Sequence, residues 1–153
     1  MKLTKTLIER ILERDNLNQA FEKVKRNKGA AGVDAKDIEA TRLHLKENGT
    51  QIIQLIKEGK YKPQPVRRVQ IPKPNGGTRN LGIPTVTDRV FQQAIVQILT
   101  PIFEPQFSQF SYGFRPNKSA HQAIEQARQY IEDGYNFVVD IDLEKFFDRV
   151  QHD

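Results

Sequence analysis

The stretch from Phe137 to Asp148 constrains the fold most, because it passes from apolar residues to acidic ones within a short run. An alternation with a period of two predicts a strand on which two aspartates share one face. The two faces carry Phe137, Val139 and Ile141, and Val138, Asp140 and Asp142. Such a strand would bring a carboxylate from a core to a solvent-exposed edge, where Mg²⁺ takes oxygen ligands and shares them with substrate phosphates. Two-metal phosphoryl transfer requires carboxylates anchored in this way.

An aspartate at the end of a strand also has a simpler explanation, because Asp often caps the turn or helix that follows. The spacing of Asp140 and Asp142 therefore does not predict catalysis by itself. We interpret Asp140 and Asp148 as structural residues.

The composition excludes several classes of protein. A chain of 153 residues with 37% hydrophobic and 28% charged residues has the length and make-up of one globular domain, or of a piece of a larger protein. The absence of cysteine excludes disulfides, thiolate nucleophiles and cysteine-based zinc sites, and the three histidines have no metal-ligand spacing. There is neither a signal-peptide pattern nor an apolar run of about 20 residues. We therefore expect a cytoplasmic protein with no membrane partner.

Positive charge is concentrated in one segment. The net charge is +5, and no acidic residue occurs between Gly59 and Thr87. We predict that this segment faces phosphate groups, with Arg67 and Arg68 among the nucleic-acid-binding residues. Its basic residues are Lys60, Lys62, Arg67, Arg68, Lys73 and Arg79.

Apolar residues at three- and four-residue spacing predict amphipathic helices along much of the chain. A glycine-containing loop, Asn27–Asp34, ends the second of these helices, and capping and turning are one explanation of its glycines. Its pattern also resembles the loop that follows the N-terminal extension helix of group II intron reverse transcriptases. The helices are expected near residues 3–12, 17–24, 41–58, 87–103 and 120–131.

Two alternating runs, residues 66–72 and 78–84, surround the turn Lys73–Gly77 and predict a β-hairpin with a loop longer than two residues. Lys73 at the tip and Arg79 on the return strand have the chemistry to bind a nucleoside triphosphate, because Arg forks onto phosphate oxygens and Lys supplies a point charge. A solvated hairpin with lysines that discourage aggregation is the alternative.

The segment Phe110–Ala120 combines aromatic and basic residues, which suits stacking on nucleobases and pairing with phosphates. Alternatively, Tyr112 and Phe114 seal a core while Arg115 pairs with an acid. Both explanations remain open from the residues alone.

Three motifs together resemble group II intron-encoded reverse transcriptases and maturases. They are the hairpin sequence Ile-Pro-Lys-Pro-Asn-Gly-Gly-Thr-Arg-Asn-Leu-Gly-Ile-Pro, the Tyr-Gly-Phe-Arg-Pro segment, and Asp142 followed five residues later by Phe147. The resemblance implies that Asp142 is catalytic and holds Mg²⁺ together with the Leu143 carbonyl. It also implies that Lys73 and Arg79 bind the triphosphate and that Phe147 excludes a ribose 2′-hydroxyl.

The same resemblance implies a template-side or supporting role for Arg115, with Lys118 in place of an arginine that is frequent in the family. The expected fold is α+β: a fragment of a right-hand polymerase, mostly helical, with a hairpin and the first palm strand. We expect N-terminal extension helices over residues 1–35, fingers over 36–134 with the hairpin at 66–84, and the start of the palm over 135–153. The implied partners are intron RNA, an RNA template–primer duplex and deoxynucleoside triphosphates.

The family's later Tyr-x-Asp-Asp motif is absent from these residues, so we expect this piece to be inactive alone. An unpaired palm strand would also favour self-association. Two other functions remain open: a non-catalytic RNA-binding module that assists splicing, and a degenerate polymerase remnant.

Overall fold

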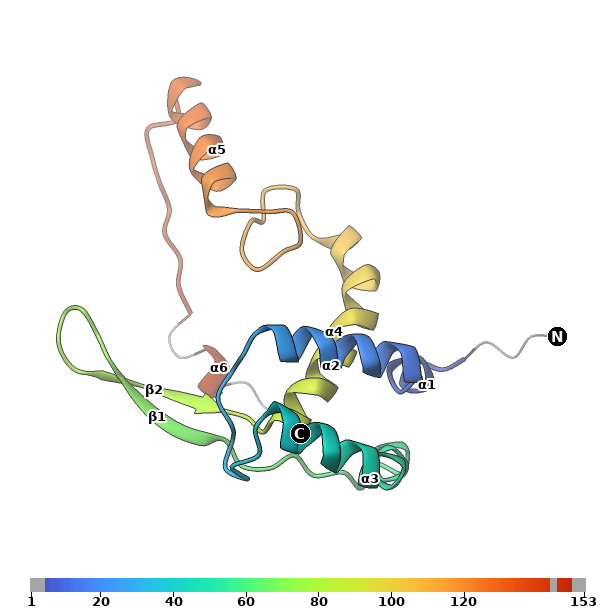
Figure 1. Ribbon diagram of the computed structural model, residues 1–153. Coiled ribbons are helices and arrows are strands. Elements are labelled where there is room, and N and C mark those ends of the chain that lie inside the picture. Colours follow the sequence, from blue (N-terminus) through green and yellow to red (C-terminus); the bar gives the residue numbers. More distant parts are fainter. Residues whose placement is uncertain (1–4, 144–145, 150–153) are drawn as a thin grey trace. The chain divides into compact units, whose positions relative to one another are not determined.

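The computed structural model describes residues 5–143 and 146–149. The chain divides into two compact units, Met1–Gln106 and Phe107–Asp153. In the first unit the elements are α1 (Leu7–Ile11), α2 (Arg14–Arg26), α3 (Ile38–Lys57), β1 (Arg67–Pro72), β2 (Thr78–Ile83), α4 (Val86–Phe103) and the 3₁₀ turn η1 (Glu104–Gln106); in the second they are α5 (Ala120–Glu132) and α6 (Phe146–Arg149) (Figure 1). The described residues thus form an α+β arrangement of helices with one two-stranded antiparallel sheet.

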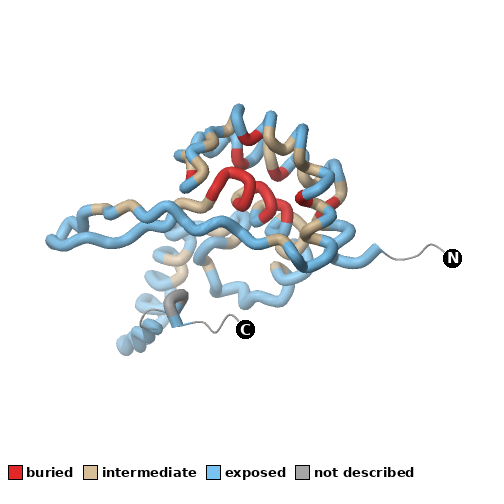
Figure 2. Tube along the Cα trace, turned by 90° about the horizontal axis from the view of Figure 1, so that it is seen from below, coloured by how far each residue is buried: buried red, intermediate tan, exposed pale blue. Residues whose placement is uncertain are grey.

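The core of the first unit lies between its helices, where the buried residues gather, while the hairpin is largely exposed (Figure 2). Helix α4 supplies the centre, because its apolar face packs on α2 and also contacts α1 and α3. The helical periodicity in the sequence therefore marks real packing faces. The buried apolar residues form two clusters, Ala20, Val24, Val86, Val90 and Ala94, and Leu12, Ile52 and Phe91.

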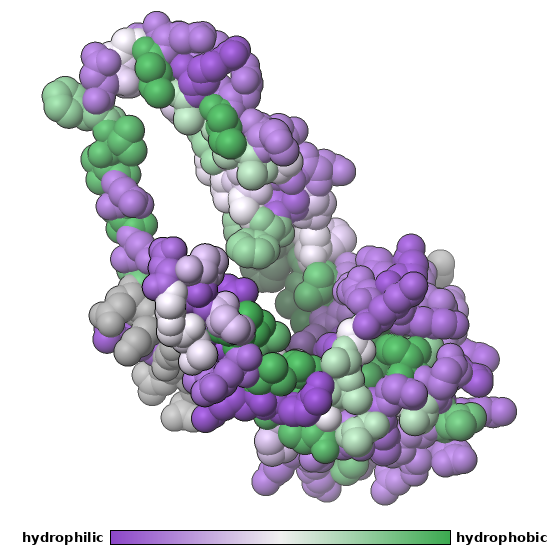
Figure 3. All heavy atoms as spheres, turned by 60° about the vertical axis from the view of Figure 1, so that its left-hand side comes forward, coloured by the Kyte–Doolittle hydropathy of each residue, from purple (hydrophilic) through white to green (hydrophobic). Residues whose placement is uncertain are grey.

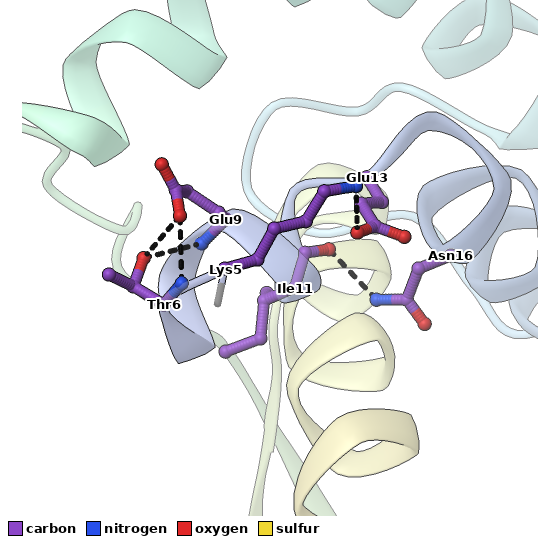
Figure 4. Close-up of polar contacts among 6 residues, drawn as sticks. All are labelled: Lys5, Thr6, Glu9, Ile11, Glu13 and Asn16. Atoms are coloured by element: carbon purple, nitrogen blue, oxygen red, sulfur yellow. Dashed lines mark hydrogen bonds and ion pairs between the residues drawn. The ribbon is translucent and has the colours of Figure 1, made fainter. Parts of the chain in front are cut away.

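The start of α1 is fixed by reciprocal hydrogen bonds, as Figure 4 shows. The Glu9 backbone N–H donates to Thr6 Oγ1 (3.3 Å), and the Thr6 backbone N–H donates to Glu9 Oε2 (2.7 Å). Two hydrogen bonds from Thr6 lower the pKa of the Glu9 carboxyl below its ordinary value. The bond from the backbone N–H has the larger effect, and the bond from the hydroxyl has the smaller one. This capping box satisfies N–H groups that a short helix leaves without partners.

Asn16 joins the first two helices to α4. Its side-chain amide donates to the carbonyls of Ile11 (2.8 Å; Figure 4) and Ala94 (3.1 Å). In return, the Gln97 amide donates to Asn16 Oδ1 at 2.7 Å. These bonds satisfy half-buried backbone groups and set the position of α2 against α4.

The hairpin is present where the alternation predicts it, and its strands agree with the expected runs to within a residue at their outer ends. Its register pairs Arg67 with Ile83 and Pro72 with Thr78. At the tip, the Lys73 N–H donates to the Gly77 carbonyl (3.0 Å) and the Gly76 N–H to the Lys73 carbonyl (3.1 Å). Gly76 and Gly77 both have positive φ angles, of 86° and 77°, which glycine adopts without a side-chain clash.

The loop at residues 27–34 does more than end α2. At Gly32 an added Cβ would stand 2.6 Å from Thr85 Cα and 2.7 Å from Thr85 N, so the loop backbone approaches the start of α4 too closely for any side chain. Arg89 secures the same contact from α4, because its Nη2 donates to the Ala30 carbonyl at 2.7 Å. Capping and turning alone therefore do not account for the glycines.

The second unit contains a loop, Phe107–Ser119, followed by α5, which begins with a capping box between Ser119 and Gln122. The prediction of a palm strand is wrong for the described residues, because residues 137–143 form no strand. A strand needs a neighbour for its backbone hydrogen bonds, and the residues described here offer this segment none. Its apolar and polar side chains alternate in the open, as the green and purple spheres below α5 show in Figure 3.

No helix in the described ranges combines the length and apolar content needed to cross a bilayer.

Candidate functional site

The hairpin sorts its basic side chains between two faces. Directly opposed residues of an antiparallel pair share a face, so Arg79 lies with Ile71, and Arg67 lies with Ile83 on that same face. The pairing continues one residue further, where Lys73 lies opposite Gly77. Because Lys73 is two residues after Ile71, it lies on the same face as Ile71 and Arg79. Arg68, one residue out of phase, lies on the other face. The register thus brings together the two predicted triphosphate-binding residues.

These cations are available to a ligand. The side chains of Arg67, Arg68, Lys73 and Arg79 are exposed. Within residues 5–143 and 146–149, none of them forms an ion pair or a side-chain hydrogen bond. With no acidic residue between Gly59 and Thr87, the hairpin presents positive charge that nothing on it neutralises. Phosphate oxygens are the complementary chemistry.

Asp88 follows the acid-free segment and lies in the first turn of α4. In the structure Asp88 is buried, with 4% of the residue exposed. It accepts hydrogen bonds from the Tyr61 hydroxyl (2.6 Å), the Gln64 N–H (3.2 Å) and the Thr85 hydroxyl (2.6 Å). Burial, and then the bond to Asp88 and the negative charge of Asp88, raise the pKa of Tyr61 above its ordinary value. Tyr61 therefore remains a donor to this carboxylate.

Arg115 and Lys118 organise the aromatic loop of the second unit. The Arg115 guanidinium lies over the Phe107 ring, 5.3 Å from its centroid, and donates to the carbonyls of Ser108 and Ser111. The Lys118 ammonium lies 5.1 Å from the centroid of Tyr112 and donates to the Gln109 carbonyl (3.0 Å). Both side chains are half-buried.

Phe114 has the opposite environment in the same loop. Its ring is fully exposed, and its φ of +56° is unusual for a bulky residue. Among the described residues Phe114 therefore does not seal a core, which was one of the two explanations that the sequence left open for it.

Asp142 and Leu143 lie in the exposed segment that follows α5. Asp142, Asp140 and the Leu143 carbonyl are oxygen donors, which suits a hard cation. However, no group of three or more His, Cys, Asp and Glu residues gathers anywhere in the described part of the chain. The donor set therefore fits Mg²⁺ in type and supplies only part of a coordination shell. The side chains of Phe147 and Asp148 lie outside the description.

The predicted residues thus fall into two groups. Lys73, Arg79, Arg67 and Arg68 belong to the first unit, while Arg115, Lys118, Asp142 and Leu143 belong to the second. The structure brings Lys73 and Arg79 onto one face and gives Arg115 and Lys118 partners within their own loop. Asp88 is the residue that sequence reasoning missed, and the signal that pointed to it was its position as the first acid after a long basic segment.

Comparison with known proteins identifies a family that the sequence matches. Residues 71–153 match the family described as reverse transcriptase (RNA-dependent DNA polymerase). The group II intron-encoded protein LtrA of Lactococcus lactis subsp. cremoris is 36% identical over 172 aligned residues, covering 99% of this chain and 28% of that protein. Protein YkfC of Escherichia coli (strain K12) is 44% identical over 98 residues, covering 61% of this chain and 26% of that protein.

A third relative, nuclear intron maturase 2, mitochondrial, of Arabidopsis thaliana, is 39% identical over 64 residues, covering 42% of this chain and 9% of that protein. The chain spans little more than a quarter of the length of LtrA and of YkfC. The match over residues 71–153 includes Lys73, Arg79, Arg115, Lys118 and Asp142.

Proposed function

The chain belongs to the reverse transcriptase family, which it matches over more than half of its length, and because its relative LtrA is a group II intron-encoded protein, we propose that it forms part of a group II intron-encoded RNA-directed DNA polymerase. In this role it supplies the triphosphate-binding hairpin and the first metal-binding carboxylate. In the full-length protein, template-directed DNA synthesis is coupled to binding of intron RNA and to its splicing and mobility.

The observation that carries this proposal is the basic hairpin. Lys73 and Arg79 share a face, are exposed and carry positive charge that no neighbouring acid offsets. An incoming deoxynucleoside triphosphate carries its negative charge on oxygens that a guanidinium can fork onto and an ammonium can approach. Neutralising that charge allows the primer 3′-oxygen to approach the α-phosphate in line.

Asp142 and the Leu143 carbonyl would hold one part of the coordination shell of a Mg²⁺ ion, because both are oxygen donors on an exposed segment. Bound there, Mg²⁺ supplies electrostatic stabilisation of the phosphate oxygens during transfer. Since one carboxylate and one carbonyl leave most of the shell to other ligands, the isolated piece is expected to be inactive alone.

Other residues would select and guide the substrates. Phe147 would meet the sugar and disfavour a ribose 2′-hydroxyl, as the family resemblance implies. Arg67 and Arg68 offer exposed guanidinium groups to nucleic-acid phosphates on the two faces of the hairpin. Arg115 and Lys118 would shape the Phe107–Ser119 loop against a template strand, with the exposed Phe114 as a stacking surface.

The binding experiment uses the chain as it is. Affinity for Mg²⁺–dTTP is measured by isothermal titration calorimetry for the wild type, for Lys73→Ala and for Arg79→Ala. Each substitution should weaken binding by about tenfold, because a charged hydrogen bond to phosphate is lost. Lys62→Ala is the matched control, since Lys62 is exposed and basic but lies before β1. Equal affinities for all four proteins would contradict the proposal.

A non-catalytic RNA-binding module is the second candidate. The exposed cations of the hairpin favour it, because they suit the phosphates of RNA as well as those of a nucleotide. RNA binding that falls steeply with salt and is equal in the wild type and in Asp142→Asn would support this function. A lower Mg²⁺ affinity in Asp142→Asn, with Asp140→Asn unchanged, would support the polymerase instead.

A further inference from the structure

The two legs of the hairpin meet at one buried carboxylate. On the entering leg, the Tyr61 hydroxyl donates to Asp88 Oδ1 (2.6 Å) and the Gln64 N–H donates to Asp88 Oδ2 (3.2 Å). On the leaving leg, the Thr85 hydroxyl donates to Asp88 Oδ2 (2.6 Å), while the Asp88 N–H donates to Thr85 Oγ1 (3.1 Å). Gln64 stands shortly before β1, and Thr85 follows shortly after β2. Asp88 therefore ties both ends of the hairpin to a single point.

The charge of Asp88 is stabilised where it lies. Asp88 is in the first turn of α4, where the helix dipole favours an anion, and it receives three side-chain or backbone donors. Hydrogen bonds to an ionised acceptor are roughly twice as strong as neutral ones. In the described part of the chain no cation pairs with this carboxylate. The carboxylate therefore accepts its hydrogen bonds from the two legs of the hairpin.

The helix that carries Asp88 is fixed to the core. Val86 and Val90, on either side of Asp88 along the chain, are buried in the main hydrophobic cluster. The close approach of Gly32 to Thr85, and the bond from Arg89 to the Ala30 carbonyl, secure this end of α4 from the other side. Because this end of α4 is fixed, the Asp88 carboxylate can hold the base of the hairpin in a defined position.

Beyond its base the hairpin has little else to orient it. Its strands pair with each other and make no extensive contact with any described helix, and nearly all of its residues are exposed (Figure 2). A close packing contact near the base is internal to the hairpin, because a Cβ on Gly82 would come within 2.8 Å of Val66 Cγ2. A small rotation at the base would therefore displace the tip by a larger distance.

We propose that Asp88 is a positioning residue that sets the direction of the hairpin relative to the helical core and thereby the location of Lys73 and Arg79. Asp88 acts through the hairpin and does not contact the substrate. The consequence for nucleotide binding rests on the function proposed above, whereas the positioning of the hairpin does not.

The test measures the orientation of the hairpin directly. The sequence has no cysteine, so spin labels can be attached at Asn75→Cys in the tip and at Glu22→Cys on the exposed surface of α2. The distance distribution between the labels is measured by electron–electron double resonance. We expect Asp88→Asn to broaden the distribution by about twofold, because a neutral amide binds the two legs more weakly. Asp15→Asn, at an exposed position in α2, is the matched control and should leave the distribution unchanged.

A second variant guards against simple unfolding. Tyr61→Phe removes one hydrogen bond to Asp88 and keeps a ring in contact with Phe91, whose centroid lies 5.6 Å from that of Tyr61. Its distribution should be intermediate in width, with the amide exchange of α2 and α4 unchanged. Wild-type distributions in both folded variants would overturn the proposal, and if Asp88→Asn does not fold, Tyr61→Phe alone decides.

The same proteins separate this inference from the proposed function. If the wild type binds Mg²⁺–dTTP, a broadened hairpin should weaken that binding by about tenfold, because displaced cations no longer meet the phosphates together. A broadened distribution combined with no binding by the wild type would support positioning and contradict nucleotide binding. An unchanged distribution with reduced binding would overturn positioning and leave nucleotide binding supported.

Discussion

At the scale of single residues, Gly32 is a packing requirement and not a turn requirement. Its φ is not in the left-handed region, and the constraint comes from the Thr85 backbone 2.6 Å from where a Cβ would stand. Because Thr85 also caps α4 and donates to Asp88, a displacement at Gly32 would propagate to the base of the hairpin.

Gly32→Ala should therefore lower the free energy of unfolding by about 1–3 kcal/mol, the usual cost of forcing atoms into a packed site. Gly49→Ala is the matched control. Gly49 lies inside α3 with no atom near its added Cβ, so alanine there should raise stability by about 0.5–1 kcal/mol. Urea denaturation followed by circular dichroism measures both, and a neutral effect of Gly32→Ala would argue against the close approach.

Tyr61 makes the free energy of unfolding depend on pH. Its pKa in the folded state is raised by burial and by Asp88, so the folded protein keeps the phenolic proton at pH values where the unfolded chain releases it. The stability that this provides is complete below about pH 10 and is lost as the pH rises further. Between pH 8 and 11, the unfolding free energy of the wild type should fall more steeply than that of Tyr61→Phe. The exposed Tyr135 supplies the control variant Tyr135→Phe, which should follow the wild type; parallel curves for all three would contradict this account.

At the scale of elements, α5 has no buried residue, so its stability depends on local interactions. The main ones are the capping box between Ser119 and Gln122 and the ion pairs of Arg128 with Glu125 (2.7 Å) and Glu132 (3.5 Å). The exposed ion pairs contribute little.

Ser119→Ala should consequently destabilise α5 by about 1 kcal/mol and reduce its helix content, because the Gln122 N–H loses its acceptor. Amide hydrogen exchange of residues 120–132 would show this as faster exchange. Exchange in α2 should not change, and Ser119→Asp should restore protection because Asp also caps. Unchanged exchange in Ser119→Ala would show that the cap contributes nothing.

The elements also show why one part of the fold was predictable and another was not. The hairpin depends on local information, since two alternating runs and a glycine-containing turn specify each other across a few residues. The stretch Phe137–Asp142 alternates just as clearly, yet it forms no strand, because a strand also requires a distant partner that the described residues do not provide. Alternation predicts which face a residue would occupy and not whether the sheet is present.

The candidate site divides in the same way. Lys73 and Arg79 were predicted together because both belong to a hairpin that the sequence pattern indicates, and the observed register gives them the same face. Arg115 and Lys118 contact carbonyls and rings of their own loop, and the residues alone did not specify these contacts. Asp88 was missed because its donors come from Tyr61 and Gln64, more than twenty residues away, which no local pattern reveals.

At the scale of the whole molecule, the two units differ in the burial of their apolar side chains. The first buries two hydrophobic clusters, whereas the second leaves large apolar side chains exposed. The exposed ones after α5 include Phe137, Val138, Val139, Ile141 and Leu143, at 64% to 96% exposure.

We therefore expect the chain to self-associate through residues 137–143, because exposed apolar side chains gather there. Sedimentation velocity over a range of concentrations should show a rising weight-average mass for the wild type and a smaller rise for Val139→Lys. Ile124→Lys adds the same charge at an exposed position on α5 and should behave as the wild type does. Equal behaviour of the two variants would show that the association, if any, does not use this segment.

The contrast between the exposed cations of the hairpin and the buried Asp88 also has a kinetic consequence. An approaching polyanion can contact the exposed cations of the arm, whereas Asp88 at its base is buried and cannot be contacted. Encounter is then steered by long-range attraction, so the association rate constant depends on ionic strength far more than the dissociation rate constant does. The arm that we propose to hold a phosphate in the complex is thus also the part of the protein that would meet it first.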